Sequence, residues 1–155
     1  MRCPTPHIRE MKITILQSKL LTKNTIAELN SLLCELKTSA FKPLTMNQWR
    51  KILDQKDVKL FIARQGGRVA GMAMLRWHWL SGGKAGTVED VVVSLKYQKQ
   101  GYGSKLMRVI IQFAKKENIA YIDLTSRPDR IAANKLYQKH GWKIRRTNVY
   151  RLDLS

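Results

Sequence analysis

The stretch from residue 87 to residue 103, TVEDVVVSLKYQKQGYG, decides the fold. A hydrophobic strand ends near residue 94, the chain turns through residues 95–100, and a helix opens at Gly101-Tyr102-Gly103. The first N–H groups of a helix lack partners within the helix, and the helix dipole adds positive charge to them. Glycine lets an anion approach the backbone there because no Cβ stands in the way. The stretch therefore predicts an anion site, with positive charge nearby on three lysines: Lys96, Lys99 and Lys105.

The glycine spacing rules out two common nucleotide-binding motifs. The dinucleotide fingerprint requires a third glycine at the position that Leu106 occupies. The phosphate-loop motif requires Gly-Lys followed by Ser or Thr, and the sequence lacks it. A strand, a glycine loop and a helix are a weak signal by themselves, because two glycines also serve simply to let a chain turn.

A second informative stretch, ANKLYQKHGW at residues 133–142, has helical spacing. Upstream of it, Ser126-Arg127-Pro128-Asp129 has the spacing of a capping box with proline in the first turn, which predicts a helix start. That helix is expected to run to about His140 and to stop at Gly141.

Hydrophobic periodicity predicts the remaining elements. Gly66-Gly67 indicates a tight hairpin, and the glycine-rich residues 81–86 indicate a turn. The expected fold is a single α+β domain with a mixed sheet of six or seven strands and about four helices. The expected strands cover residues 12–17, 58–64, 68–80, 87–94, 120–125, 142–146 and 149–154, and the helices cover 23–36, 46–54 (capped by Thr45 or Asn47), 103–117 and 126–140.

Both stretches resemble signatures of the GNAT family of acyl-CoA N-acyltransferases. The segment QKQGYG at residues 98–103 is similar to the family's [QR]-x-x-G-x-[GA] pyrophosphate motif, and residues 133–142 are similar to its A-x-x-L-Y-x-x-x-G-[FW] helix. Both lie in the family's order, and the resemblance is best over residues 87–154. It implies a GNAT-like fold and an N-acetyltransferase that uses acetyl-CoA as cosubstrate and attacks it directly with a primary amine in a ternary complex.

The resemblance also implies roles for individual residues. The backbone of Val91 and Val93 would bind pantetheine, and Asn134 would contact the same arm. Tyr137 would protonate the departing thiolate, although an aromatic residue at that helical spacing is more often part of a core. The pyrophosphate would lie on the loop formed by Gln98, Lys99, Gln100, Gly101, Tyr102, Gly103 and Ser104.

Two neighbouring carboxylates, Glu89 and Asp90, are candidates for the base that takes the amine proton through a water. Successive strand residues face opposite sides, so at most one of them should reach the acceptor. Glu89 is preferred because it matches the acid often found there in related sequences. A β-bulge in the strand would reverse this parity, and a carboxylate at the exposed start of a strand needs no catalytic role.

The formal net charge of +18 is the extreme value in the composition. It is spread evenly, because residues 1–77 and residues 78–155 each carry +9. The chain has no basic tail and no arginine-rich arm. Charge alone therefore decides nothing about the partner. Two alternatives stay open: a module that binds acetyl-CoA without turnover, and a basic RNA- or ribosome-associated protein, for which a clustered basic patch would be expected.

The remaining features set expectations about location and partners. Cys3 and Cys34 lack metal-ligand spacing, so no metal is expected. The two cysteines also predict a reduced cytoplasmic protein. Residues 1–10 are expected to be a disordered leader before a domain at residues 11–155, with no membrane span. The acceptor amine is expected on a small molecule, a protein N-terminus or a lysine. Polyamines and aminoglycosides are disfavoured unless the cleft is locally acidic. The oligomeric state is not predicted.

Overall fold

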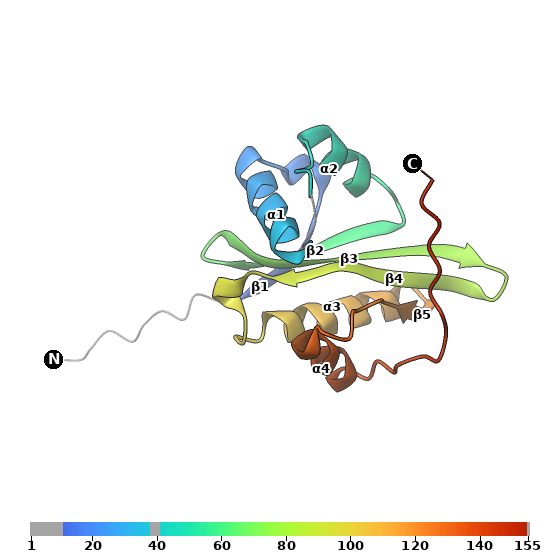
Figure 1. Cartoon of the computed structure of the whole chain (residues 1–155). Helices are drawn as coiled ribbons and strands as arrows, with labels where there is room; N and C mark the ends of the chain where they lie inside the picture. Colours follow the sequence, from blue (N-terminus) through green and yellow to red (C-terminus); the bar gives the residue numbers. More distant parts are fainter. Residues whose placement is uncertain (1–10, 38–40, 155) are drawn as a thin grey trace. The chain divides into compact units, whose positions relative to one another are not determined.

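The computed structural model describes residues 11–37 and 41–154, which form two compact units divided between Thr125 and Ser126 (Figure 1). The first unit contains five strands and three α-helices, and the second contains one α-helix. The predicted leader at residues 1–10 lies outside the described residues. The elements are β1 (Lys12–Leu16), η1 (Ser18–Leu20), α1 (Lys23–Leu36), α2 (Met46–Leu53), β2 (Val58–Gln65), β3 (Arg68–Leu80), β4 (Gly83–Val93), η2 (Leu95–Tyr97), α3 (Tyr102–Lys116), β5 (Ile119–Asp123) and α4 (Ile131–Lys139).

The five strands form one mixed sheet in the order β1-β2-β3-β4-β5. The first three pairs are antiparallel and the last, β4 with β5, is parallel. Gly66 and Gly67, with φ of 56° and 83°, turn the β2–β3 hairpin as the sequence predicts. Because β5 lies parallel to β4, helix α3 connects them as a crossover.

The sheet is covered on both faces within the first unit, and alternation along β2 explains why. Leu60 and Ile62 face the side of α1 and α2, where they join a cluster that includes Leu29 and the fully buried Trp49. The intervening Phe61 meets Phe113 of α3 with ring centroids 5.4 Å apart. Figure 1 shows α1 and α2 on one side of the sheet and α3 on the other.

The helices of the first unit form close to where periodicity predicts them. Helix α1 has the predicted bounds, and α2 and α3 differ from theirs by one residue at the ends. Thr45, one of the two predicted caps of α2, accepts from the backbone N–H of Gln48, whose side chain accepts from the Thr45 backbone. This capping box starts an eight-residue helix.

Strand β4 begins at Gly83, so the predicted turn over residues 81–86 is wrong for residues 83–86. The loop between β3 and β4 consists of Ser81 and Gly82 alone. Gly86 lies inside the strand, where an added Cβ would lie 2.8 Å from the Ile122 side chain of β5. This glycine permits close approach of two strands, which sequence alone does not distinguish from a turn.

The predicted capping box at Ser126 is wrong, because α4 begins at Ile131 with Arg130 as its N-cap. The N–H of Arg130 donates to the Arg127 carbonyl at 3.1 Å, which closes a β-turn with Pro128 in its second position. Proline favours that position because its fixed φ suits the turn. The Asp129 carboxylate does not cap a helix, and it lies 3.6 Å from the guanidinium Nε of Arg127.

The two predicted strands at residues 142–146 and 149–154 are absent, so the described residues contain five strands rather than six or seven. Alternating hydrophobicity suggested them, but a strand also needs a backbone ladder and a covered face. Neither is present here, since the large apolar side chains of this segment are mostly exposed: Ile144, Val149, Tyr150, Leu152 and Leu154.

Among the helices that the structure describes, none has the length and apolar character needed to cross a membrane.

Candidate functional site

Strand β4 has a strand neighbour on both sides for only part of its length. Its pairing with β5 covers Lys84 to Thr87, whereas its pairing with β3 continues to Val93. Residues 88–93 therefore have β3 as a neighbour on one side and, among the residues that the structure describes, no strand on the other. A strand edge of this kind presents alternating N–H and C=O groups, to which an extended ligand with amide groups can add.

A β-bulge interrupts β4 within this one-sided segment. Met74 pairs with Glu89 and Met72 pairs with Val92, so Asp90 and Val91 together lie opposite Ala73. Asp90 has φ of 49°, in the left-handed region that aspartate tolerates better than most residues. A bulge twists the strand and redirects its backbone groups, and bulges are common beside active sites.

The bulge follows Glu89, and it separates the surroundings of the two candidate bases. Register places Glu89 on the face of Met74 and Val92, which is the side of α1 and α2. Its side chain is exposed and makes no hydrogen bond or ion pair with a described residue. The Asp90 carboxylate lies 3.6 Å from the ammonium of Lys37, which caps the C-terminus of α1.

Helix α1 also holds the start of the loop that follows β4. The Ser94 hydroxyl and the Leu95 N–H donate to the two carboxylate oxygens of Glu35, at 3.1 and 3.0 Å. Further along, the Gln98 side chain donates to the Val93 carbonyl at 3.1 Å. The Gln100 side chain donates to the carbonyl of Lys96, also at 3.1 Å. The loop is thus shaped by side-chain amides that bind its own carbonyls.

The loop ends at Gly101, the N-cap of α3, whose φ of 87° is a left-handed conformation. An added Cβ would meet nothing within 4 Å, so the space in front of this glycine is open. Tyr102 turns its ring into the core, 5.8 Å from that of Tyr97, and leaves its backbone at the helix start. Open space therefore lies before the helix N-terminus at which the sequence predicts an anion site.

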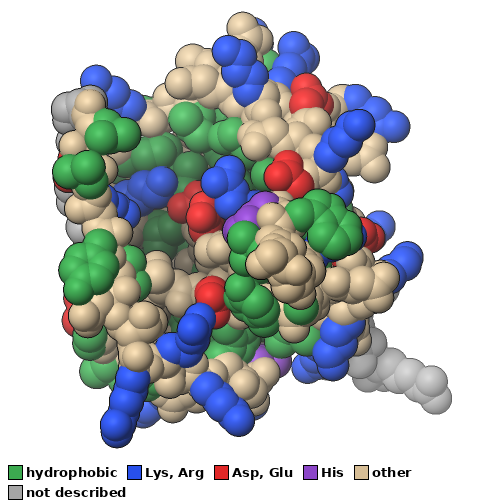
Figure 2. Space-filling model, turned by 90° about the vertical axis from the view of Figure 1, so that its right-hand side faces the viewer, with side chains coloured by type: hydrophobic (Ala, Val, Ile, Leu, Met, Phe, Trp, Pro, Cys, Tyr) green, Lys and Arg blue, Asp and Glu red, His purple; other side chains and the backbone are tan. Residues whose placement is uncertain are grey.

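The lysines around the loop differ in their partners. Lys105 donates to the carbonyl of Met11, which joins the first turn of α3 to the start of β1. Lys96 lies over the ring of Tyr97, 5.4 Å from its centroid, and Lys99 is exposed with φ of 60°. Figure 2 shows one face of the molecule, where Lys and Arg side chains are spread widely with acidic side chains among them.

The second unit carries the remaining predicted site residues on α4. Asn134 donates from its side chain to the Arg127 carbonyl at 2.9 Å. Tyr137 is buried, with 4% of its surface exposed, and its ring centroid lies 6.2 Å from that of Trp142. Burial raises the pKa of the Tyr137 phenol, and the positive charge of Arg130 opposes part of this rise. The phenol is therefore protonated at neutral pH.

Sequence reasoning missed the residues of α1 that support the site. Glu35 and Lys37 reach the loop and the bulge from positions more than 50 residues earlier in the chain. No local spacing marks such contacts, because both residues also fit the solvated face of an amphipathic helix. In the described part of the chain, no three His, Cys, Asp or Glu residues gather in a metal-binding group.

The sequence resemblance implies an acyltransferase fold, and the bulged strand that leads into a glycine-capped helix is compatible with that class. The sequence matches the model of the acetyltransferase (GNAT) family over residues 26–142, about three quarters of the chain. The chain belongs to this family and is an N-acetyltransferase by class.

Solved structures share this fold at low sequence identity. An aminoglycoside acetyltransferase from an uncultured soil metagenomic sample superposes with a TM-score of 0.81 at 18% identity, covering 92% of this chain and 95% of that one. An acetyltransferase of Trypanosoma brucei gives 0.75 at 22% identity, covering 94% and 100% of the two chains. Glucosamine-6-phosphate N-acetyltransferase from Arabidopsis thaliana superposes with a TM-score of 0.75 at 18% identity, covering 92% of this chain and 98% of that one.

Proposed function

We propose that this protein transfers an acetyl group from acetyl-CoA to a primary amine, by direct attack of the amine on the thioester in a ternary complex. The observation that carries the proposal is the bulged, one-sided segment of β4, which runs without interruption into the loop that ends at Gly101. Such an edge suits an extended arm with amide groups, and the open helix start suits the phosphates at the other end of the same ligand.

Different residues would bind the different parts of acetyl-CoA. The backbone of Val91 and Val93 would bind the pantetheine amides, and one N–H in this segment would polarise the thioester carbonyl. The backbone of residues 98–104 would bind the pyrophosphate. The side chains of Gln98 and Gln100 would act as braces, because both bind loop carbonyls. Asn134 would contact the pantetheine arm, as the family resemblance implies.

The transfer itself moves protons off the nitrogen and onto the sulfur. The amine nitrogen forms a bond to the acetyl carbon while the carbon–sulfur bond breaks, giving an N-acetylated amine and CoA. An acceptor that arrives as an ammonium ion loses two protons: Glu89 would accept the first through a water and pass it to solvent, and the second would restore the Tyr137 phenol after the thiolate is protonated. Tyr137 would donate its proton to the thiolate, which its buried, protonated phenol suits.

We prefer Glu89 to Asp90 as the base because of their surroundings. Asp90 is engaged by Lys37 and lies within the bulge, whereas Glu89 is exposed without a partner among the described residues. A carboxylate without a cationic partner also favours an acceptor that arrives as an ammonium ion. The acceptor we propose is therefore a cationic primary amine, on a small molecule or a protein.

Calorimetric titration of acetyl-CoA at moderate salt, with a short RNA duplex as polyanion control, tests the cosubstrate. One-to-one binding that persists in salt sufficient to abolish duplex binding is expected. Thiol release across a panel of primary amines then tests turnover. If acetyl-CoA binds but no amine in the panel causes release of the CoA thiol, a binding module is favoured. If only the duplex binds, an RNA-associated protein is favoured.

A further inference from the structure

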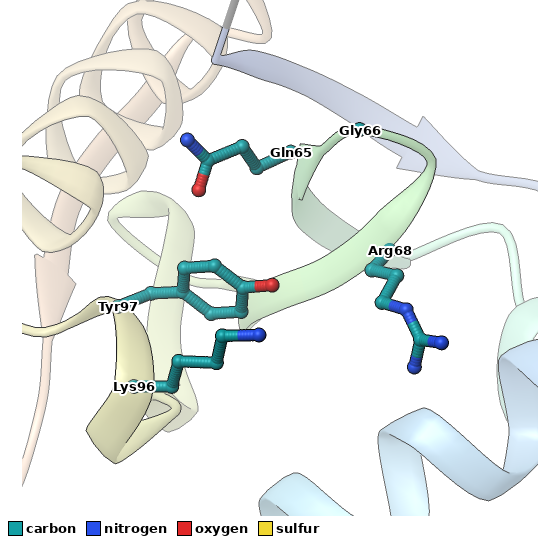
Figure 3. A pocket seen from close by; sticks show the side chains of 5 residues that line it. All are labelled: Gln65, Gly66, Arg68, Lys96 and Tyr97. Atoms are coloured by element: carbon teal, nitrogen blue, oxygen red, sulfur yellow. The ribbon is translucent and has the colours of Figure 1, made fainter. Parts of the chain in front are cut away.

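A cavity next to the predicted pyrophosphate loop lies between the β2–β3 turn and η2 (Figure 3). Its volume is about 330 Å³, near the lower end of the range typical of small-molecule sites, roughly 300–1,000 Å³. Five residues from two distant parts of the first unit line it: Gln65, Gly66, Arg68, Lys96 and Tyr97.

The lining of this cavity is rich in hydrogen-bond donors and contains no carboxylate. Arg68 and Lys96 contribute positive charge, and the Tyr97 hydroxyl and the Gln65 amide contribute neutral donors. Figure 3 shows the polar ends of Lys96 and Tyr97 directed toward the same space, with Arg68 across it; the Arg68 guanidinium and the Gln65 amide are turned away from them. The contact of the Lys96 ammonium with the Tyr97 ring, 5.4 Å from its centroid, holds these two side chains together.

The acidic residues of α1 that lie near these elements are engaged elsewhere. Glu28 accepts from the Val69 N–H at 3.3 Å and lies 4.0 Å from Arg64. Glu35 accepts from the start of η2, as described above. Among the residues that the structure describes, the ion pairs therefore leave Arg68 and Lys96 without a carboxylate partner.

We propose that this cavity binds a phosphate group, held by Arg68 and Lys96 with the Tyr97 hydroxyl as a third donor. Two cationic side chains that line one cavity without a carboxylate favour an anion, and a guanidinium that turns into the cavity matches the geometry of phosphate oxygens. The cavity is larger than one phosphate, which leaves room for the group that carries it. Two sources share this chemistry: a separate phosphorylated small molecule, and the 3′-phosphate of acetyl-CoA, since η2 runs directly into the predicted pyrophosphate loop.

The test is calorimetric titration of sodium phosphate into the full chain, at constant ionic strength adjusted with sodium chloride. The chain is first saturated with acetyl-CoA, so that the pyrophosphate loop is filled and does not compete for phosphate. The variants are Arg68→Gln and Lys96→Gln, with Arg50→Gln as matched control, because Arg50 is an exposed arginine on α2 that does not line the cavity. All three positions are exposed, and thermal unfolding checks that each variant folds.

If a separate molecule supplies the phosphate, one phosphate binds per saturated chain. Arg68→Gln and Lys96→Gln each weaken this binding roughly tenfold, as expected for loss of a charge-assisted hydrogen bond, and Arg50→Gln does not. If acetyl-CoA supplies it, phosphate binds only when 3′-dephospho-acetyl-CoA replaces acetyl-CoA. Arg68→Gln then weakens acetyl-CoA and leaves the 3′-dephospho form unchanged.

The proposal is overturned if phosphate binds to neither saturated form, or if it binds equally well to Arg68→Gln, Lys96→Gln and Arg50→Gln. Failure of the proposed function appears separately, as an absence of acetyl-CoA binding in the first step. Phosphate would then be titrated into the chain alone, where loss of binding in Arg68→Gln but not Arg50→Gln supports the cavity.

Discussion

At the scale of single residues, Glu89 and Asp90 are adjacent carboxylates with different surroundings. Glu89→Gln keeps the shape of the side chain and removes its capacity to accept a proton, so we expect kcat to fall roughly 10²-fold or more. Acetyl-CoA affinity should change little, because Glu89 is not among the residues proposed to bind it. Steady-state kinetics with an amine found in the thiol-release panel, together with calorimetry, measures both quantities.

The matched control is Asp90→Asn, which loses an ion pair to Lys37 that is partly exposed. Such pairs contribute at most about 1 kcal/mol, so a small loss of stability and a modest change in kcat are expected. A larger fall in kcat for Asp90→Asn than for Glu89→Gln would assign the base to Asp90 instead.

Tyr137 gives a second residue-scale prediction, which concerns pH. Burial raises the pKa of its phenol, so in the unfolded chain it ionises near its ordinary value of about 10, and in the folded chain it ionises above that. The stability contributed by the neutral phenol is complete below pH 10 and is lost as pH rises through the folded pKa. Tyr137→Phe should therefore lose less stability than the wild type between about pH 9 and pH 11.

Urea unfolding at both pH values measures this difference, and Tyr150→Phe serves as the control because Tyr150 is 87% exposed. Kinetics adds an independent reading, since loss of the proton donor should lower kcat of Tyr137→Phe roughly 10²-fold at neutral pH. An unchanged kcat would make Tyr137 a core residue, which is the role that helical spacing alone suggests.

Single residues also mark the limit of what the sequence could predict about the site. The glycine pattern predicted a helix that opens within Gly101-Tyr102-Gly103, and α3 begins there, at Tyr102, after the left-handed N-cap Gly101. The contacts of Glu35 and Lys37 with the loop and the bulge could not be predicted. They depend on how α1 packs on the sheet, which joins residues about 50 to 60 positions apart.

At the scale of elements, the junction between loop and helix at Gly101 allows a test of stability against binding. Gly101→Ala forces a left-handed alanine, at a cost of roughly 1–2 kcal/mol, with no clash to add to it. Urea unfolding should show that loss. Acetyl-CoA binding should weaken further than the stability loss explains, because the new methyl group occupies the open space in front of the helix N-terminus.

Gly82→Ala is the matched control for this change. Its added Cβ also meets nothing within 4 Å, and its φ lies outside the left-handed region. It should be neutral or slightly stabilising, since alanine restricts the unfolded chain more than glycine. Equal acetyl-CoA affinity in Gly101→Ala and Gly82→Ala would contradict an anion site at the start of α3.

Elements were predicted well where the local sequence specifies them, and poorly where a distant partner decides. Helix α1 has its predicted bounds because a periodic apolar face defines it. Strand β3 has its predicted bounds because a run of apolar residues, buried over 69–75, lies between two glycine-containing turns. The final strands failed because alternation in residues 142–154 does not supply a neighbouring strand. The predicted helix start around Pro128 was wrong because proline also suits the second position of a β-turn, and the chain forms that turn.

At the scale of the whole molecule, the charge of +18 predicts the response to salt. The ion pairs Lys37–Asp90, Arg64–Glu28 and Arg127–Asp129 all have partly exposed side chains, so salt has little attraction to weaken in them. Salt should instead weaken the repulsion among the many positive charges, which destabilises the compact state. Raising sodium chloride from about 0.02 M to about 0.15 M shortens the screening length from roughly 20 Å to roughly 8 Å.

The free energy of unfolding in urea should therefore rise over this range of salt. Sucrose at equal osmolality is the control for effects other than screening. A fall in stability with salt would mean that attraction dominates locally despite the net charge. Chloride is the anion to use, because phosphate would also stabilise the fold by mass action at the cavity between the β2–β3 turn and η2. A larger gain in phosphate than in chloride at equal ionic strength should persist in Arg50→Gln and shrink in Arg68→Gln.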